Sequence, residues 1–295
     1  MTLTLRSTCY NHQDYVLECL DSVAEQDSGG FEWVIVDDAS TDNSPDLIQQ
    51  WLAQHHEALR ARDIRVELIL HEQNRGFTAT LNEILTRAKG DWLCGISCDD
   101  RMLPHRLSRV RQAMQAIPQH YAGIYGDAYV IDAHGQRSEP RFIARHRALE
   151  TMPQEDLFEV LLAGNFIPAP TVAVVRQRLL DLGGYDVSLA YEDYDMWLRL
   201  TRTTPLAYDP EPTVEYRIHG QNLHLQITDW RQINYWIYRK HLDVAAGARR
   251  FFGNLKGLQK HGQINACIRE DVRQLDLAGQ PGGAALQRAI LAGHC

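Results

Sequence analysis

Short apolar runs alternate with amphipathic stretches along the first 117 residues. Four runs rich in β-branched and aromatic side chains predict buried strands, over residues 3–9, 31–36, 64–70 and 92–96. Apolar residues at helical spacing predict helices over 15–24, 77–88 and 104–117. A further helix is expected from Ser44-Pro45, a side-chain cap followed by a proline suited to the first helical position. This alternation predicts an α/β fold with a mostly parallel sheet and helices on both faces.

The pattern changes after residue 117. It predicts a strand over 123–132, a turn at His134-Gly135, and then helix, strand and helix over 154–163, 171–175 and 192–200. From about residue 221 the pattern is helical, with breaks expected at Gly253, Gly257, Gly262 and residues 280–283. We therefore expect one domain over 1–220, made of halves 1–117 and 118–220, and a helical C-terminal extension over 221–295.

Polar side chains follow each of the first four predicted strands. In open α/β sheets, ligands bind beyond the carboxyl ends of the strands. The segments found there are Thr8–Asn11, Asp37–Asp42, Asn74–Gly76 and Ser97–Asp100. The carboxylate pairs Asp37-Asp38 and Asp99-Asp100 can line one crevice, where their oxygen atoms would suit Mg²⁺ or Mn²⁺. The alternative for both pairs is local, because Asp and Ser also build turns and cap helices.

Composition and missing motifs exclude several classes of protein. The 295-residue chain has a formal net charge of −8, which argues against broad nucleic-acid binding. It contains no G-x-G-x-x-G, G-x-x-x-x-G-K-[ST] or G-x-S-x-G, which argues against dinucleotide dehydrogenases, P-loop NTPases and α/β-hydrolases. None of its six cysteines forms a C-x-x-C pair, and we expect Cys94 and Cys98 to be buried free thiols. Without a signal core or an apolar stretch of about 20 residues, we expect a cytoplasmic protein with no transmembrane segment.

Several segments resemble, in order and with similar spacing, the motifs of family 2 glycosyltransferases. They are Thr8–Asn11, Leu20–Gln26, Glu32–Asp42, Asn74–Gly76 with Asn82, Ala88–Asp91, Gly183–Asp186, Glu192–Arg199 and Tyr216–His219. The resemblance covers residues 3–222 and implies an inverting enzyme with the GT-A fold. Residues 1–117 would bind a nucleotide sugar, in the first place a UDP-sugar, and 118–220 the acceptor.

The resemblance also implies roles for individual residues. Thr8, Tyr10, Asn11 and Asp38 would bind the nucleotide, with Asp38 at the edge of the base. Arg75 would approach the base or the diphosphate; the alternative is a surface arginine.

A divalent cation, Mn²⁺ or Mg²⁺, is expected at the fourth strand end. Many family members have Asp-x-Asp-Asp where this chain has Ser97-Cys98-Asp99-Asp100, so the first carboxylate is missing. The resemblance puts the ribose at Asp99 and the metal at Asp100, without fixing the division of roles between them. His219 would contact the diphosphate or the metal; a structural histidine in a loop is equally compatible with the sequence.

The general base is expected at Asp193. A carboxylate that takes the proton of an acceptor hydroxyl typically contributes a factor of about 10²–10⁴. The resemblance places this role at Asp193, at the start of the helix predicted from Glu192. The alternative is that both acidic residues only complement the helix dipole.

The expected partners are a nucleotide-sugar donor and a saccharide or lipid-linked acceptor, in bacterial surface polysaccharide or glycolipid synthesis. The C-terminal extension carries an aromatic cluster with basic neighbours, which includes Trp230, Tyr235, Trp236, Phe251 and Phe252. Packing against the catalytic domain or a second copy in a homodimer is one interpretation, and peripheral contact with the inner membrane face is the other. Because Ser97 replaces a carboxylate, a non-catalytic nucleotide-sugar-binding partner is the alternative to an enzyme, and the intact Glu192-Asp193 argues against it.

Overall fold

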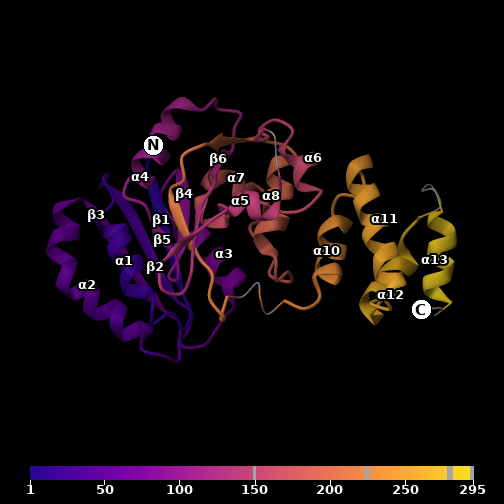
Figure 1. The fold of residues 1–295 in the computed structure, drawn as a ribbon, viewed down its shortest axis with the longest axis horizontal. Coiled ribbons are helices and arrows are strands. Elements are labelled where there is room, and N and C mark those ends of the chain that lie inside the picture. The colour runs from indigo at the N-terminus through magenta and orange to yellow at the C-terminus, as the bar shows by residue number, and fades with distance from the viewer. Residues whose placement is uncertain (149–150, 223–224, 226, 278–281, 293–295) are drawn as a thin grey trace. The chain divides into compact units, whose positions relative to one another are not determined.

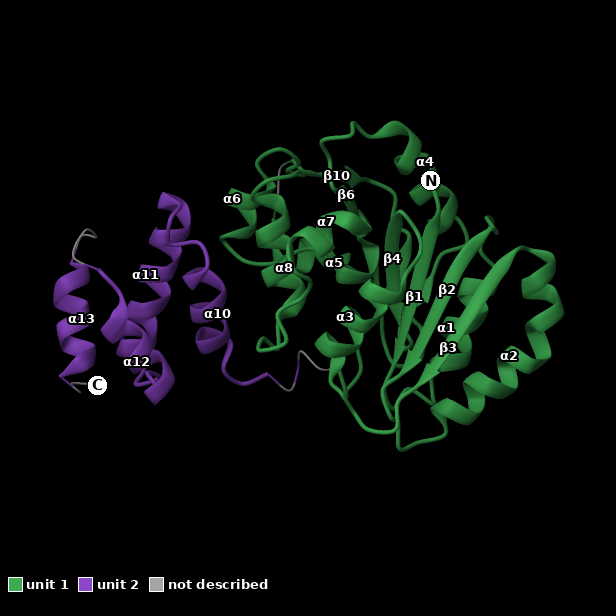
Figure 2. Cartoon of the chain, turned by 180° about the vertical axis from the view of Figure 1, so that it is seen from behind, with its two compact units in different colours: residues 1–222 green, residues 223–295 purple. Residues whose placement is uncertain are grey.

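The computed structural model describes residues 1–148, 151–222, 225, 227–277 and 282–292. The chain divides into two compact units, residues 1–222 and 223–295 (Figure 2). Among the described residues, no helix combines the length and the apolar character needed to cross a membrane.

The main sheet of unit 1 is built on four parallel strands. They are β1 (Leu3–Cys9), β2 (Phe31–Asp37), β3 (Ile64–Leu70) and β4 (Trp92–Ser97), in the spatial order β4-β1-β2-β3. Of these four strands, β2 is buried along its whole length, whereas the edge strand β3 is buried only in part. Because they run the same way, their carboxyl ends meet at one edge, which confirms the predicted α/β sheet.

Three shorter strands extend this sheet beyond β4. β9 (Ala173–Val175) is antiparallel to both of its neighbours, and β6 (Gly123–Gly126) and β10 (Leu206–Asp209) follow. A second, smaller sheet has the order β5-β11-β7-β8, from β5 (Arg101–Met102), β11 (Val214–Arg217), β7 (Tyr129–Ile131) and β8 (Arg137–Ser138). Since β5 directly follows Asp99-Asp100, its pairing with β11 brings residues 217–219 close to those carboxylates.

Helices cover both faces of the main sheet (Figure 1). On one face, α1 (Val16–Ala24), α2 (Ser44–Ala61) and α4 (Arg106–Ala116) bury a core that includes Leu5, Trp33 and Val110. On the other face lie α3 (Phe77–Arg87), α7 (Arg176–Asp181) and α8 (Glu192–Thr201). Short helices α5 (Phe142–His146), α6 (Leu157–Leu161) and η1 (Ala169–Thr171) complete the unit.

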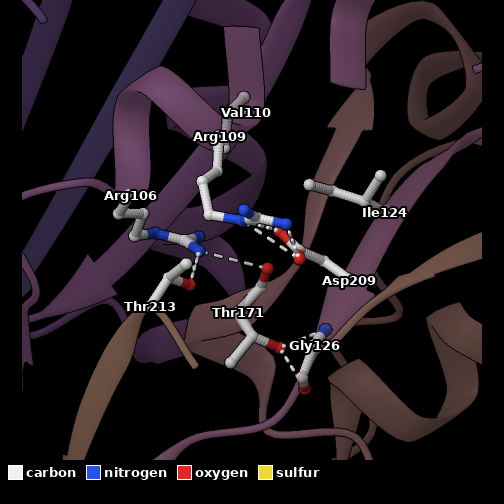
Figure 3. A pocket seen from close by; sticks show the side chains of 8 residues that line it. All are labelled: Arg106, Arg109, Val110, Ile124, Gly126, Thr171, Asp209 and Thr213. Atoms are coloured by element: carbon white, nitrogen blue, oxygen red, sulfur yellow. Dashed lines mark hydrogen bonds and ion pairs between the residues drawn. The ribbon is translucent and has the colours of Figure 1, made fainter. Parts of the chain in front are cut away.

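A polar pocket shows how α4 is tied to the strands around it (Figure 3). The Arg109 Nε lies 2.8 Å from Asp209 Oδ2 at the end of β10. The buried Arg106 guanidinium donates to the Thr171 carbonyl at 3.2 Å and to Thr213 Oγ1 at 3.1 Å. These bonds join α4 to η1 and to the start of β11, so the pocket has a structural role.

Three local predictions for unit 1 are corrected. The expected strand over 123–132 is two strands in different sheets, because the chain turns at Asp127, whose carboxylate accepts the Ala128 and Ile143 N–H groups. The helix expected over 154–163 is the short α6. Ser44 does not cap α2: its hydroxyl accepts the His12 N–H, and Asp42 accepts the Ser44 N–H.

Unit 2 is helical, from α10 (Trp230–Arg239), α11 (Ala245–Lys260), α12 (Ala266–Gln274) and α13 (Gly283–Leu291). The breaks predicted at Gly253 and Gly257 are wrong, since α11 runs through both; residues 280–281 lie outside the described residues. Part of the aromatic cluster packs inside this unit, with the Tyr235 and Phe251 ring centroids 4.9 Å apart. The five cysteines that the structure describes are free thiols, and Cys94 and Cys98 are buried as predicted.

Candidate active site

At the end of β1, Tyr10 presents an exposed ring and Asn11 holds the loop that follows β2. The Tyr10 side chain is 42% exposed, so its ring is free to stack on a ligand. Asn11 has a positive φ of 57°, and its Oδ1 accepts the Thr41 N–H at 2.8 Å. Thr8 is buried, with Oγ1 3.5 Å from Ser97 Oγ on the neighbouring strand. These residues therefore join the ends of β1, β2 and β4.

The carboxylates of the first pair, Asp37 and Asp38, accept hydrogen bonds from two different loops. Asp37 accepts the Ser40 N–H at 2.8 Å and its hydroxyl at 2.6 Å, so the turn interpretation is confirmed for this residue. Asp38 accepts the backbone N–H groups of Arg75 at 2.8 Å and Gly76 at 2.9 Å. Asp38 thus fixes the loop after β3, where Arg75 is exposed and forms an ion pair with Glu83.

Asp99 faces two histidines and an amide. Its Oδ2 lies 3.1 Å from His219 Nε2, 3.3 Å from Asn222 Nδ2 and 3.8 Å from His12 Nε2. Burial alone would raise the Asp99 pKa, but the hydrogen bond from His219 and the charge of His12 lower it below its ordinary value. The structure therefore brings together two predicted residues, Asp99 and His219, with one that the sequence analysis missed, His12.

Asp100 faces the backbone of β11 instead. Its Oδ1 accepts the Arg217 N–H at 2.7 Å. Burial and the neighbouring Asp99 raise the Asp100 pKa well above its ordinary value. The buried Arg217 guanidinium donates to the Asp99 carbonyl at 2.7 Å and to Glu18 Oε2 at 2.7 Å. Arg217 thus organises this region, a role that its place in the Tyr216–His219 motif could have suggested.

The donor set around Asp99 fits a divalent cation. One ligand atom from each of His12, Asp99 and His219 lies within 4.8 Å of the others. The buried Asp99 Oδ1 and His12 Nδ1 have no hydrogen-bond partner among the described residues. Two imidazole nitrogens and a carboxylate oxygen form a mixed set that suits Mn²⁺ better than Mg²⁺, which prefers oxygen ligands.

The second carboxylate pair opens α8. Asp193 Oδ1 accepts the Tyr194 N–H at 2.7 Å, and Oδ2 lies 3.3 Å from Asn165 Nδ2. Burial raises the Asp193 pKa to about 6, although both of these bonds favour the ionised form. Burial and the charge of Asp193 raise the Glu192 pKa to about 8. At pH 7 Glu192 is therefore largely protonated, and Asp193 is an ionised base poised near neutrality.

Comparison with known proteins gives relatives along the whole chain. Residues 7–183 match the sequence profile of the family described as glycosyl transferase family 2. An uncharacterized protein of Mycobacterium tuberculosis is 26% identical over 297 residues, which covers 98% of this chain and 79% of that protein. TuaG of Bacillus subtilis, a putative teichuronic acid biosynthesis glycosyltransferase, is 24% identical over 232 residues, with 78% of this chain and 84% of TuaG covered.

Solved structures share the fold. S. aureus TarS 1–349 in complex with UDP-GlcNAc superposes with a TM-score of 0.66 at 18% identity, covering 99% of this chain and 82% of that one. The mannosyltransferase PcManGT of Pyrobaculum calidifontis, in complex with GDP-Man and Mn²⁺, gives 0.58 at 17% identity, with 99% and 85% covered. The profile match spans more than half of the chain and includes the ends of β1 to β4. The chain therefore belongs to glycosyltransferase family 2 and is a glycosyltransferase with the GT-A fold.

Proposed function

We propose that this enzyme transfers a sugar from a UDP-sugar to a hydroxyl acceptor, with inversion, in the synthesis of a polysaccharide or glycolipid. The observation that carries the proposal is Asp193: a half-buried carboxylate at the start of α8, with a pKa of about 6. The UDP-GlcNAc and GDP-Man complexes of structural neighbours, and the name of TuaG, support the donor class and the kind of product.

In this proposal Asp193 takes the proton from the acceptor hydroxyl. The hydroxyl oxygen attacks the anomeric carbon from the face opposite the diphosphate, and the bond to the leaving oxygen breaks, so the diphosphate departs with the electron pair. One displacement inverts the anomeric centre. The two hydrogen bonds to Asp193 hold its carboxylate in a fixed orientation toward the acceptor.

His12, Asp99 and His219 would hold the divalent cation, which we assign to Mn²⁺. When bound, the cation neutralises the charge that grows on the leaving diphosphate. Asp100 is not assigned as a direct ligand, because among the described residues the side chains whose ligand atoms gather here are His12, Asp99 and His219. Exposed Tyr10 would stack on the base, and Thr8, Asn11, Asp38 and Arg75 would shape the nucleotide-binding loops.

The test is diphosphate release from a panel of UDP-, GDP- and dTDP-sugars with Mn²⁺, followed by NMR of the product. We expect UDP release with one donor and a product of inverted anomeric configuration. A retained configuration would contradict the single displacement. Binding of UDP without turnover of any donor would favour the non-catalytic alternative.

A further inference from the structure

Arg6 is a cation on an otherwise neutral strand, on the face of the sheet that carries α8. Side chains alternate along β1, so Arg6 shares its face with Thr8 and not with the buried Leu5. Its guanidinium extends toward the carboxyl end of the strand, with Nη1 3.5 Å from Thr8 Oγ1. Arg6 therefore lies two residues before Thr8, on the same face of β1, next to the candidate active site.

Gly95 makes room for this side chain. In the register of β1 and β4, Arg6 lies beside Gly95 and Thr8 lies beside Ser97. A Cβ at position 95 would lie 2.5 Å from Arg6 Cγ and 2.7 Å from Cζ. The Arg6 side chain thus occupies the space beside Gly95, and a larger residue at position 95 would displace it.

Arg6 has no counter-ion among the described residues. Within that part of the chain, no carboxylate oxygen lies within 4.0 Å of its guanidinium nitrogens. Its charge nevertheless lowers the pKa of both Glu192 and Asp193, so it acts on the catalytic carboxylates without pairing with them. Its partners among the described residues are neutral, Thr8 Oγ1 at 3.5 Å and the Phe77 ring with its centroid 6.0 Å from Cζ. A partly buried arginine without a carboxylate partner is suited to binding an anion.

The polar groups that lead from Arg6 to the end of β4 are uncharged. Ser97 Oγ lies 3.5 Å from Thr8 Oγ1, which in turn lies 3.5 Å from Arg6 Nη1. Neither β1 nor β4 contains a carboxylate side chain, so these two strands leave the positive charge of Arg6 available to a ligand.

We propose that Arg6 binds a carboxylate carried by the sugar that reacts next to Asp193. This proposal rests on the proposed transferase function and narrows its substrate to an acidic sugar. The anion can belong to the donor sugar or to the acceptor, and the experiment has one arm for each.

The experiment is calorimetry of the whole chain with Mn²⁺. The donor arm compares UDP-glucuronate with UDP-glucose, and the acceptor arm compares methyl glucuronide with methyl glucoside while UDP is bound. In one arm we expect the charged probe to bind at least tenfold more tightly. Arg6→Gln and Gly95→Ala should both remove this preference; the second keeps the charge but displaces it. Arg65→Gln, on exposed β3, is the matched control and should retain the preference.

The outcomes separate the two proposals. If UDP itself fails to bind, the proposed function fails and the Arg6 proposal with it. If UDP binds normally but neither arm distinguishes charged from uncharged probes, or if the preference survives Arg6→Gln, only the Arg6 proposal is overturned. Gly95→Ala keeps the test decisive if Arg6→Gln does not fold.

Discussion

Two pairs of adjacent carboxylates, Asp99-Asp100 and Glu192-Asp193, look alike in the sequence and differ in their surroundings. In each pair one member is ionised at pH 7 and its neighbour has the higher pKa. Asp99 is ionised by imidazoles, while Asp100 is buried against a backbone N–H. Asp193 is ionised by an amide and a backbone N–H, with its own pKa near neutrality, while Glu192 retains its proton.

The difference lies in what the ionised member faces. Asp99 faces nitrogen atoms that can share a cation with it, so it suits metal binding. Within the described residues, Asp193 accepts hydrogen bonds from the Tyr194 N–H and the Asn165 amide, and each carboxylate oxygen keeps a lone pair for a proton. When the surroundings of two neighbouring carboxylates move their pKa values apart, the two can take different roles as acid, base or metal ligand. In the first pair these surroundings are imidazoles, and in the second they are an amide and a backbone N–H.

The largest expected effect comes from removing the base. Asp193→Asn keeps the shape and removes the basicity, so kcat should fall by about 10² or more while the affinity for UDP stays within a few-fold. Glu192→Gln is the matched control: because Glu192 is protonated at pH 7, this change should alter kcat by only about threefold. If Glu192→Gln instead lost most of kcat and Asp193→Asn retained it, the base would be Glu192 and not Asp193.

The affinity for Mn²⁺ should depend more on Asp99 than on Asp100. Asp99→Asn should weaken Mn²⁺ binding, measured by the EPR signal of the free ion, at least tenfold, about 1.4 kcal/mol. Asp100→Asn should have a smaller effect, because an amide oxygen can still accept the Arg217 N–H. His12→Gln should weaken binding as well, whereas the exposed His56→Gln should not. Equal losses for Asp99 and Asp100 would mean that both are ligands.

The pH dependence of kcat tests which carboxylate is the base. Asp193 acts when ionised, so with a pKa of about 6 the rate should be constant above pH 7 and fall about tenfold per unit well below pH 6. A base at Glu192 would instead place this limb near pH 8. A pH profile under saturating donor and acceptor distinguishes the two values.

Most of the fold, and the members of both pairs, could be predicted from the sequence. Strands 3–9 and 64–70 match the structure residue for residue, because in each a short run with apolar residues at alternate positions ends at a polar segment. The strand expected over 123–132 failed because Asp127 captures two backbone N–H groups and redirects the chain, and nothing in an apolar pattern reports such bonds.

The partners of the carboxylates could not be predicted in the same way. His219 reaches Asp99 across 120 positions of sequence only because β11 pairs with β5. His12 follows directly after the Tyr10-Asn11 turn, yet its role depends on where the fourth strand ends. Contacts of this kind come from the topology of the sheet. The sequence therefore identified both acidic pairs, and the resemblance assigned the base to Asp193, but the division of roles between Asp99 and Asp100 stayed open.

The smallest expected effect concerns the groups that keep Asp193 ionised. Asn165→Ala removes a donor to Asp193 Oδ2, which favours the protonated form and raises the Asp193 pKa. One such hydrogen bond contributes about 0.5–1.5 kcal/mol. Since one pKa unit corresponds to about 1.4 kcal/mol, the acidic limb should move up by roughly 0.4–1 pH unit.

Arg6→Gln should move the acidic limb in the same direction, because it removes a positive charge that favours the ionised form of Asp193. Pure charge effects are screened by salt, so the Arg6 shift should shrink between about 0.05 and 0.5 M salt while the Asn165 shift persists. The exposed Gln177→Ala on α7 is the control for both. If neither variant moves the limb, the surroundings of Asp193 do not set its pKa, and the contrast between the two carboxylate pairs would have to rest on the metal site alone.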